Sequence, residues 1–337
     1  AQKILQAFEQ PFQIAERELF ISASVGITLY PFDDNTLDGL LRNADLAMYR
    51  AKEMGRNMYQ FYAAEMTLNA RQRLALENAL RYALERGELH LDYQPIIDIQ
   101  KGKIVGVEAL LRWRHAQWGP IEPEQFIPLT EDTGLIISIG AWAIDTALAQ
   151  MRAWRERGVG PLRLAIHISA RQFDTTLMGT LNDALRRYEF DPKNLDLELT
   201  ESMLMRNVDH TLELLQELDT LGIQISIDDF GTGYSSLSYL KRFAIAPLKI
   251  APSFVRDIPA DPDDAAIAVG IIALAHSLGI KVVADGVETV EQLQFMYRYG
   301  CELVQGFYFS PAQPELDFAQ LARDVSARLT PLGLSGD

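Results

Sequence analysis

The chain has 337 residues, of which 48% are hydrophobic and 23% are charged, the proportions of a globular protein with one large domain and a smaller unit. Its formal net charge of −15 argues against a general DNA-binding protein, because phosphate backbones are held by surplus lysine and arginine. Cys301 is the single cysteine and no stretch reaches the roughly 18 apolar residues of a membrane span, so we expect no intramolecular disulfide, no membrane contact and a cytoplasmic location.

The first 62 residues predict a small α+β unit. A strand over 20–30 is followed by a loop at 31–36, a helix over 37–55 and a second short strand over 57–62, judged from the spacing of the apolar residues. The chain begins without methionine and its first residues are not a signal peptide. We therefore interpret it as a fragment of a longer protein.

This unit resembles the C-terminal part of a GGDEF domain, the fold of diguanylate cyclases, through the strings SVGIT, ADLAMYRAKEMGRN and QFY. The GG[DE]EF signature itself is found nowhere in the chain. The resemblance thus implies a truncated GGDEF-like fragment over 1–62 that serves as a structural remnant or spacer rather than as a cyclase.

Residues 63–85 predict a connecting helix. Beyond it, strand-like apolar runs alternate with helical patterns, which is typical of a parallel α/β sheet or barrel. The eight predicted strands are 89–99, 103–113, 162–169, 195–200, 223–230, 246–250, 280–285 and 302–306. The helices predicted between the third and eighth strands are 173–190, 208–221, 235–243, 264–279 and 290–300.

Eight strands with an outer ring of helices over 86–329 favour a TIM-like (β/α)8 barrel, because the segment has the usual size of that fold. The first two strands are separated only by the tripeptide QKG, which predicts an antiparallel hairpin. An open doubly wound α/β sheet is the alternative. Residues 330–337 are expected to form a C-terminal tail.

Active sites in such barrels lie at the carboxyl ends of the strands. The polar residues predicted there are Glu108, His167, Glu198, Asp228, Asp229, Lys249, Asp285 and Gln305. A single acidic residue after a strand is commonly a helix cap, but four or more carboxylates at one mouth repel one another unless cations neutralise them. Oxygen-rich ligand sets suit Mg²⁺ or Mn²⁺, and two such ions can clamp a phosphodiester.

Six strings make the larger domain similar to the EAL domain family. They are EALLRW (108–113), ELTES (198–202), DDFGTGYSSLSYL (228–240), LKI with SFV (248–255), GVET (286–289) and QGFYFS (305–310), in the order of that family. The resemblance implies hydrolysis of cyclic di-GMP to linear pGpG with two divalent cations, Mg²⁺ or Mn²⁺.

The resemblance also implies roles for individual residues. The metal ligands would be Glu108, Glu198, Asp228 and Asp229, with Asp228 bridging, together with the ligand positions held by His167 and Asp285. Lys249 would orient water and phosphate, and Asp285 and Glu108 would share in catalysis. Contacts to the ligand or its loops would come from Gln94, Leu110, Arg112, Gln305 and Glu288. Arg112 has a planar guanidinium that can donate two hydrogen bonds to a phosphate. Glu288 would orient the loop after the fifth strand.

That loop, GTGYSSLSYL at 231–240, couples the metal site to a dimer interface in the family, so the resemblance implies a homodimer. Its glycines and serines are equally compatible with an ordinary flexible turn. Both interpretations remain open on the sequence alone.

Three residues depart from the family pattern at the metal centre. His167 stands where the family has an asparagine ligand, and an imidazole favours softer ions such as Zn²⁺. Asp285 replaces a glutamate, which retracts the carboxylate by one methylene, and a misplacement of about 1 Å can cost roughly a hundredfold in rate. Ala251 replaces an aspartate and removes its charge.

These departures leave two main functions open. The first is a cyclic di-GMP phosphodiesterase, slowed or altered in its metal preference. The second is a non-catalytic cyclic di-GMP receptor, because the expected ligand contacts of Gln94, Leu110 and Arg112 do not depend on metal. A protein-interaction module without ligand is a third alternative.

Overall fold

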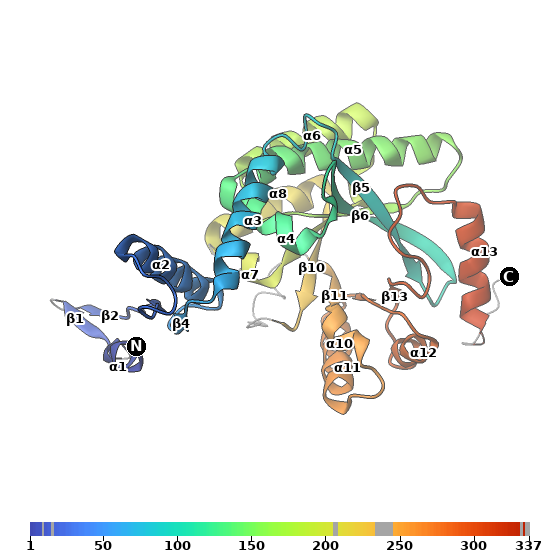
Figure 1. The fold of residues 1–337 in the computed structure, drawn as a ribbon. Coiled ribbons are helices and arrows are strands. Elements are labelled where there is room, and N and C mark those ends of the chain that lie inside the picture. Colours follow the sequence, from blue (N-terminus) through green and yellow to red (C-terminus); the bar gives the residue numbers. More distant parts are fainter. Residues whose placement is uncertain (9, 15–16, 205–207, 233–244, 331–332, 334–337) are drawn as a thin grey trace. The chain divides into compact units, whose positions relative to one another are not determined.

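The protein is described here from a computed structural model, which covers residues 1–8, 10–14, 17–204, 208–232, 245–330 and 333. The chain divides into two compact units, Ala1–Tyr82 and Ala83–Asp337 (Figure 1). Unit 1 holds the GGDEF-like residues and the predicted connecting helix. Unit 2 holds the predicted barrel.

Unit 1 is a small α+β arrangement built around one long helix. Its elements are α1 (Gln2–Ala7), β1 (Phe12–Ile14), β2 (Arg17–Leu19), β3 (Val25–Ile27), α2 (Leu37–Glu53), β4 (Tyr59–Phe61) and α3 (Ala64–Leu80). The side chain of Thr36 accepts a hydrogen bond from the N–H of Gly39 and so begins α2, as an N-cap residue does. β3 and β4 pair in parallel, and α2 packs on both.

The predicted strand over 20–30 is wrong at both ends, because only Val25–Ile27 form a strand. The reason is that a strand needs a hydrogen-bonded partner, and β4 pairs with these three residues alone. The sequence analysis also missed the antiparallel pair β1–β2. These strands are only three residues long, too short to show a clear alternation of apolar residues.

Unit 2 is a closed eight-stranded barrel, which confirms the predicted fold and excludes the open sheet. Hydrogen bonds join the strands in the order β5-β13-β12-β11-β10-β9-β8-β6, and pairing of β5 with β6 closes the ring. The strands are β5 (Leu89–Asp98), β6 (Lys103–His115), β8 (Arg163–His167), β9 (Leu195–Thr200), β10 (Gln224–Phe230), β11 (Ile245–Ile250), β12 (Val282–Ala284) and β13 (Leu303–Val304), with β7 (Gly119–Ile121) paired to β6 outside the ring.

The direction of β5 differs from that of the other strands in the ring. It runs antiparallel to both of its neighbours, β6 and β13, so the predicted first hairpin is confirmed. The other seven strands of the ring run in parallel. Their carboxyl ends therefore meet at one end of the barrel, which we call the mouth.

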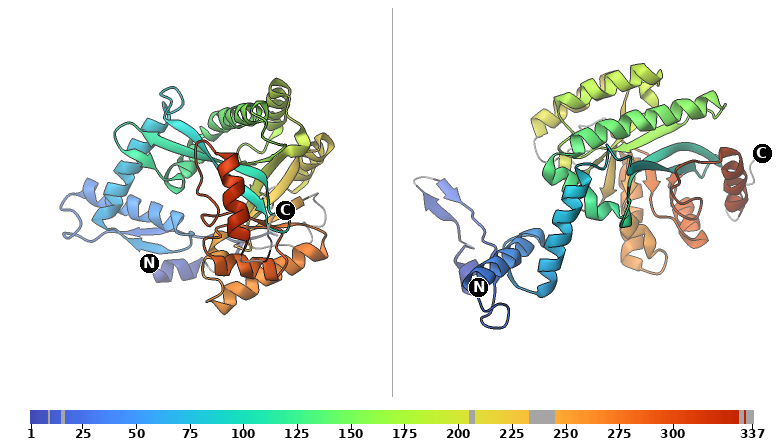
Figure 2. Two further views of the ribbon diagram at one scale, coloured as in Figure 1. Left: turned by 90° about the vertical axis from the view of Figure 1, so that its right-hand side faces the viewer. Right: turned by 45° about the horizontal axis from the view of Figure 1, so that its top comes forward.

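Helices surround the barrel, as Figures 1 and 2 show. They are α4 (Pro123–Thr133), α5 (Ile136–Glu156), α6 (Thr175–Tyr188), α7 (Glu201–Leu204), α8 (Val208–Leu221), α10 (Pro252–Arg256), α11 (Pro262–Ser277), α12 (Val290–Arg298) and α13 (Phe318–Leu329), with a 3₁₀ turn at Pro192–Asn194. The apolar core lies between these helices and the strands. Strand β9 illustrates how side chains divide between the two faces of the barrel wall. Its leucines Leu195, Leu197 and Leu199 belong to the core under the helices. The alternating acidic residues of the strand therefore face the barrel interior.

Helices α4 and α5 were not predicted from the sequence. α4 does carry helical signals, since Pro123 occupies its first turn and Gly134 ends it with a φ of 79°. The predicted helix over 235–243 lies outside the described residues. No single described helix is long and apolar enough to cross a membrane, and α4 with α5 meets that measure only as a pair bent by 120°.

Candidate active site at the mouth of the barrel

The ammonium group of Lys249, on β11, forms the centre of the site, and the residue is 1% exposed. Its Nζ donates to Oε2 of Glu108 at 3.1 Å and to Oε2 of Glu198 at 2.9 Å. It also lies 3.5 Å from Oδ1 of Asp228. These three acidic residues come from β6, β9 and β10. The barrel thus brings three of the predicted carboxylates to one buried cation.

His167, the last residue of β8, lies among the same carboxylates. Its Nε2 contacts the carboxylate of Glu108 and lies 2.9 Å from Oε2 of Glu198. Its Nδ1 lies 3.3 Å from Oδ2 of Asp228. The His167 side chain is 42% exposed, whereas those of Glu108 and Glu198 are almost fully buried. The imidazole therefore lies between the buried carboxylates and solvent.

Two glutamines extend this network. Nε2 of Gln305 donates to Oε1 of Gln94 at 2.9 Å and to Oε2 of Glu108 at 2.5 Å. Gln94 lies directly opposite Glu108 in the β5–β6 pairing and donates through Nε2 to the carbonyl oxygen of Ser310. Oε1 of Gln305 is buried and accepts no hydrogen bond from the residues that the structure describes. Because an unsatisfied buried oxygen is costly, this atom is suited to a bound water or ion.

Leu110 and Arg112 lie on β6 at alternate positions beyond Glu108, so all three share one face of the strand. Nε of Arg112 donates to Oδ2 of Asp92 at 3.1 Å. Oδ1 of Asp92 is buried and has no hydrogen-bond partner among the described parts of the chain. Asp92 was not predicted from the sequence, although it shares the alternation of β5 with Gln94. The pairing holds the Arg112 side chain in place while leaving it 28% exposed.

The remaining predicted residues lie at the rim of this cluster. Asp229, next to Asp228, has a φ of 53°, a left-handed conformation that non-glycine residues adopt mainly at constrained sites. Asp285 follows β12 directly, and its Oδ1 accepts from the N–H of Gly286. Glu288 is exposed and contributes its N–H to Gln292. The loop that Glu288 is expected to orient lies mostly outside the described residues, as does the expected dimer interface.

The charges in the cluster shift the pKa values of its members strongly. Burial, with a contribution from the charge of Glu108, raises the pKa of Glu198 to about 7. Burial also raises the pKa of Asp285 to about 7. Burial also disfavours the charged forms of Glu108, Lys249 and His167, but the neighbouring opposite charges outweigh it. As a result, the pKa of Glu108 is well below its usual range, and the pKa values of Lys249 and His167 are well above theirs. Carboxylates with pKa values near neutrality are typical of functional sites.

The cluster also fits a divalent cation. Glu108, His167 and Glu198 each offer one ligand atom, and these atoms all lie within 4.8 Å of one another. Within the described ranges this is the one such group of histidine, cysteine or acidic residues. Ala251, where the family resemblance leads us to expect an aspartate, is 2% exposed and brings no ligand. The donor set is therefore oxygen-rich with one imidazole.

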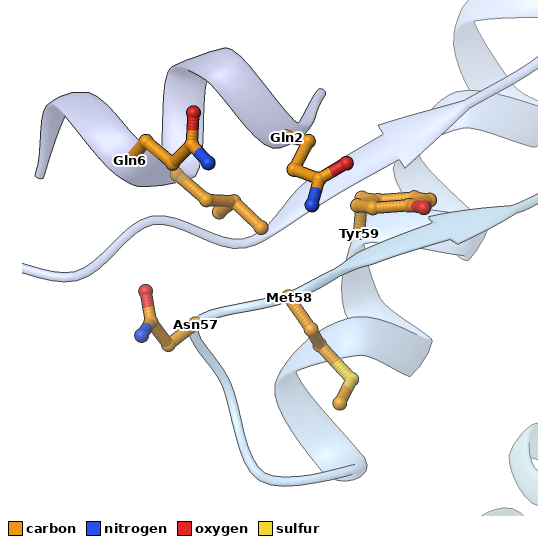
Figure 3. Close-up of a pocket in the computed structure, with 6 residues that line it drawn as sticks. Gln2, Gln6, Asn57, Met58 and Tyr59 are labelled. Carbon is orange, nitrogen blue, oxygen red and sulfur yellow. The ribbon is translucent and has the colours of Figure 1, made fainter. Parts of the chain in front are cut away.

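A separate pocket of ≈ 290 Å³ lies within unit 1 (Figure 3). It is lined by Gln2, Leu5, Gln6, Asn57, Met58 and Tyr59. These side chains carry no formal charge, so the pocket offers neither a cation for a phosphate nor a carboxylate for a metal. The polar chemistry of the described chain is concentrated at the barrel mouth instead.

Comparison with solved structures gives close neighbours of unit 2. A structure described as the PaMucR phosphodiesterase in complex with c-di-GMP is 48% identical, has a TM-score of 0.69, and aligns over 71% of this chain and 98% of its own. The FimX EAL domain from Pseudomonas aeruginosa bound to c-di-GMP is 25% identical with a TM-score of 0.65 and aligns over 73% and 98%.

Curated proteins extend the similarity across both units. The bifunctional diguanylate cyclase/cyclic di-GMP phosphodiesterase MucR of Pseudomonas aeruginosa is 48% identical over 93% of this chain and 46% of its own length. The cyclic di-GMP phosphodiesterase PdeR of Escherichia coli is 40% identical over 94% and 48%. This chain thus spans about half the length of the curated relatives it matches.

Two sequence families match the chain in succession. The family described as diguanylate cyclase, GGDEF domain, matches residues 1–58. The EAL domain family matches residues 77–312, a range that includes every residue of the cluster at the barrel mouth. The chain therefore belongs to the EAL domain family, with a match to the GGDEF domain family at its first residues.

Proposed function

We propose that unit 2 is a metal-dependent phosphodiesterase that hydrolyses cyclic di-GMP to linear pGpG. The observation that carries this proposal is the convergence of Glu108, Glu198 and Asp228 around Lys249 at the mouth of an EAL barrel. The similarity to MucR and PdeR, both described as acting on cyclic di-GMP, supports the same substrate. The cytoplasmic location and the homodimer expected from the sequence belong to this proposal.

An anionic substrate needs local positive charge in a chain whose net charge is −15. Lys249 is surrounded by carboxylates, so it is largely neutralised within the protein. Arg112 is the partly exposed cation on the same strand face as Glu108, and its guanidinium suits a phosphate oxygen. We assign ligand contacts to Arg112, Leu110 and Gln94.

The carboxylates would hold the divalent cations, Mg²⁺ or Mn²⁺ in the family pattern, through Glu108, Glu198, Asp228 and Asp229 with His167. When bound, such ions polarise the phosphate and lower the pKa of a bound water. The oxygen of a water would attack phosphorus as one P–O bond to the ribose breaks, and the released ribose oxygen would take up a proton to become the free hydroxyl of the linear dinucleotide. Asp285, with a pKa of about 7, is suited to accept the proton of the water.

One observation favours the alternative of a non-catalytic cyclic di-GMP receptor. The imidazole of His167 contacts Glu108 and lies 2.9 Å from Glu198, so this position offers a nitrogen rather than the oxygen ligand that Mg²⁺ and Mn²⁺ prefer. Ala251 provides no ligand to compensate. The contacts assigned to Arg112, Leu110 and Gln94 do not depend on this metal site.

The deciding experiment is incubation of the purified chain with cyclic di-GMP and Mg²⁺ or Mn²⁺, with chromatography of the products. We expect pGpG from the unmodified chain and none from Glu108→Gln. Glu156→Gln, which changes a carboxylate that pairs with Arg152 on the surface of α5, is the matched control and should leave the rate unchanged. Absence of pGpG together with micromolar binding by calorimetry would establish the receptor instead, and absence of both would leave a protein-interaction module.

A further inference from the structure

The three ligand atoms at the mouth include one imidazole nitrogen, and its surroundings are those of a metal-bound histidine. Nε2 of His167 faces the carboxylates of Glu108 and Glu198. On the other side of the ring, Nδ1 lies 3.3 Å from Oδ2 of Asp228. Histidines that bind metals commonly present their second ring nitrogen to a carboxylate, which fixes the tautomer and the ring orientation. Asp228 is placed to act as this positioning residue.

The ligand types set the preference among ions. Mg²⁺ requires near-ideal octahedral oxygen coordination and keeps several of its waters. Imidazole suits Zn²⁺, Ni²⁺ and other late first-row ions, and sites with three protein ligands of mixed histidine and carboxylate type are common for Zn²⁺. A set of two carboxylates and one imidazole, supported by a further carboxylate, therefore favours such an ion over Mg²⁺.

The same geometry favours one tightly held ion rather than two. Paired ions in two-metal sites lie about 3.5–4 Å apart and share carboxylate ligands. Here the shared carboxylates already contact Lys249, at 2.9 Å from Glu198 and 3.1 Å from Glu108. The position of Ala251 lacks a carboxylate, and Oδ1 of Asp285 accepts from the N–H of Gly286. Of the predicted ligand oxygens, those of Asp229 and Oδ2 of Asp285 remain outside these contacts, so a second ion would have to rely on them.

We propose that Glu108, His167 and Glu198, with Asp228 orienting the imidazole, form a site for a single late first-row divalent cation of the Co²⁺–Zn²⁺ group. This proposal rests on the proposed function in taking the mouth as the metal centre. It differs from the two Mg²⁺ or Mn²⁺ ions implied by the family resemblance. It assigns to His167 the selection of the metal.

The test uses Co²⁺ as a spectroscopic probe, added to the full chain after removal of metals with a chelator. We expect one Co²⁺ per chain by calorimetry and elemental analysis, with visible absorption bands that report nitrogen ligation. Most protein sites bind Co²⁺ more tightly than Mg²⁺, so the deciding quantity is the ratio of the two affinities. In His167→Asn this Co²⁺/Mg²⁺ ratio should fall at least tenfold and the absorption bands should shift.

His276→Asn is the matched control, because His276 is similarly exposed (40%) and lies 3.2 Å from one carboxylate, that of Glu302. It should leave the stoichiometry, the ratio and the spectrum unchanged. Thermal melting of each metal-free variant checks that the fold persists. Two Co²⁺ ions per chain, or an unchanged ratio in a folded His167→Asn, would overturn the proposal. No readout in this test involves cyclic di-GMP. The metal assignment can therefore be refuted while the proposed hydrolysis with Mg²⁺ is retained, and the hydrolysis can be refuted while the metal assignment is retained.

Discussion

Nζ of Lys249 donates to Oε2 of Glu198 at 2.9 Å, and both side chains are only 2% exposed. The two residues lie on neighbouring parts of the ring, β11 and β9, with β10 between them. A buried ion pair contributes little compared with apolar packing, but removal of one partner leaves a buried charge without compensation. Lys249 is therefore central to the stability of the mouth as well as to its chemistry.

Replacement of Lys249 by methionine should destabilise the protein by about 3 kcal/mol at pH 8, the usual cost of breaking a buried pair. The loss should be smaller at pH 6, because the pKa of Glu198 is about 7 and its carboxylate can then take a proton. Urea unfolding at both pH values measures this. Lys101→Met, which removes a cation that is 65% exposed, should cost only a small fraction as much, and equal losses in the two variants would refute the argument.

Asp196 is expected to make the stability of the fold depend on pH in a second way. It is buried and accepts from the hydroxyl of Ser226 at 2.8 Å, and burial raises its pKa from 3.8 to about 6. The folded state thus holds a proton that the unfolded state releases between these values, so this residue lowers stability as the pH rises from about 4 to 6.

Asp196→Asn should remove this dependence while retaining an acceptor for Ser226. Relative to the unmodified chain, the variant should gain on the order of 2 kcal/mol of unfolding free energy between pH 4 and pH 7, since one pKa unit corresponds to about 1.4 kcal/mol. Denaturant titrations of both proteins at the two pH values give the difference. A parallel pH dependence in the two proteins would show that Asp196 does not titrate in this range.

Arg112→Ala should weaken binding of cyclic di-GMP at least tenfold, because a charge-assisted hydrogen bond to phosphate contributes about 1.5–3 kcal/mol. Calorimetry in the Glu108→Gln background, which is expected to be inactive, measures binding without turnover. Arg152→Ala, at an exposed arginine on α5 paired with Glu156, should bind as the unmodified chain does. An Arg112→Ala variant with full affinity would remove this residue from the ligand site.

The sequence was sufficient to predict the barrel, because the eight apolar runs and the hairpin between the first two are local patterns. It also identified Glu198 and Lys249 near the ends of their strands, but the prediction that Glu108 closes its strand is wrong, because β6 continues to His115. Their convergence on one ammonium group was not predictable, since it depends on how the closed ring aligns β6, β9 and β11. The Arg112–Asp92 pair depends in the same way on the register of β5 with β6.

Restoration of the family residues should raise Mg²⁺-dependent turnover. The triple variant His167→Asn, Asp285→Glu and Ala251→Asp returns oxygen ligands at positions 167 and 251 and extends the carboxylate at position 285 by one methylene. Correction of a misplacement of about 1 Å can restore roughly a hundredfold in rate. We expect an increase of at least tenfold in the rate of pGpG formation at saturating Mg²⁺. His276→Asn serves as a control with no expected change. No rise in a folded triple variant would mean that these residues do not limit the reaction.

The backbone next to Gln305 requires a glycine at position 306. Its φ is 152°, and a Cβ atom there would lie 2.2 Å from the carbonyl oxygen and 2.4 Å from the nitrogen of Val287. The N–H of Val287 donates to the carbonyl oxygen of Gln305, and the N–H of Tyr308 donates to that of Val287. A side chain at position 306 would separate these backbones and displace Gln305 from Glu108.

Gly306→Ala should therefore destabilise the protein by about 2 kcal/mol or more, as changes at strained backbone positions do, and should reduce both ligand affinity and turnover. Gly270→Ala is the matched control, because Gly270 lies within α11 and a Cβ there meets no atom within 4 Å. The free energy of unfolding of that control should rise by about 0.5–1 kcal/mol, since alanine has a higher helix propensity than glycine. Thermal melting and the pGpG assay on both variants measure these effects, and a Gly306→Ala variant with unchanged melting and activity would show that the close approach to Val287 is not needed to hold Gln305.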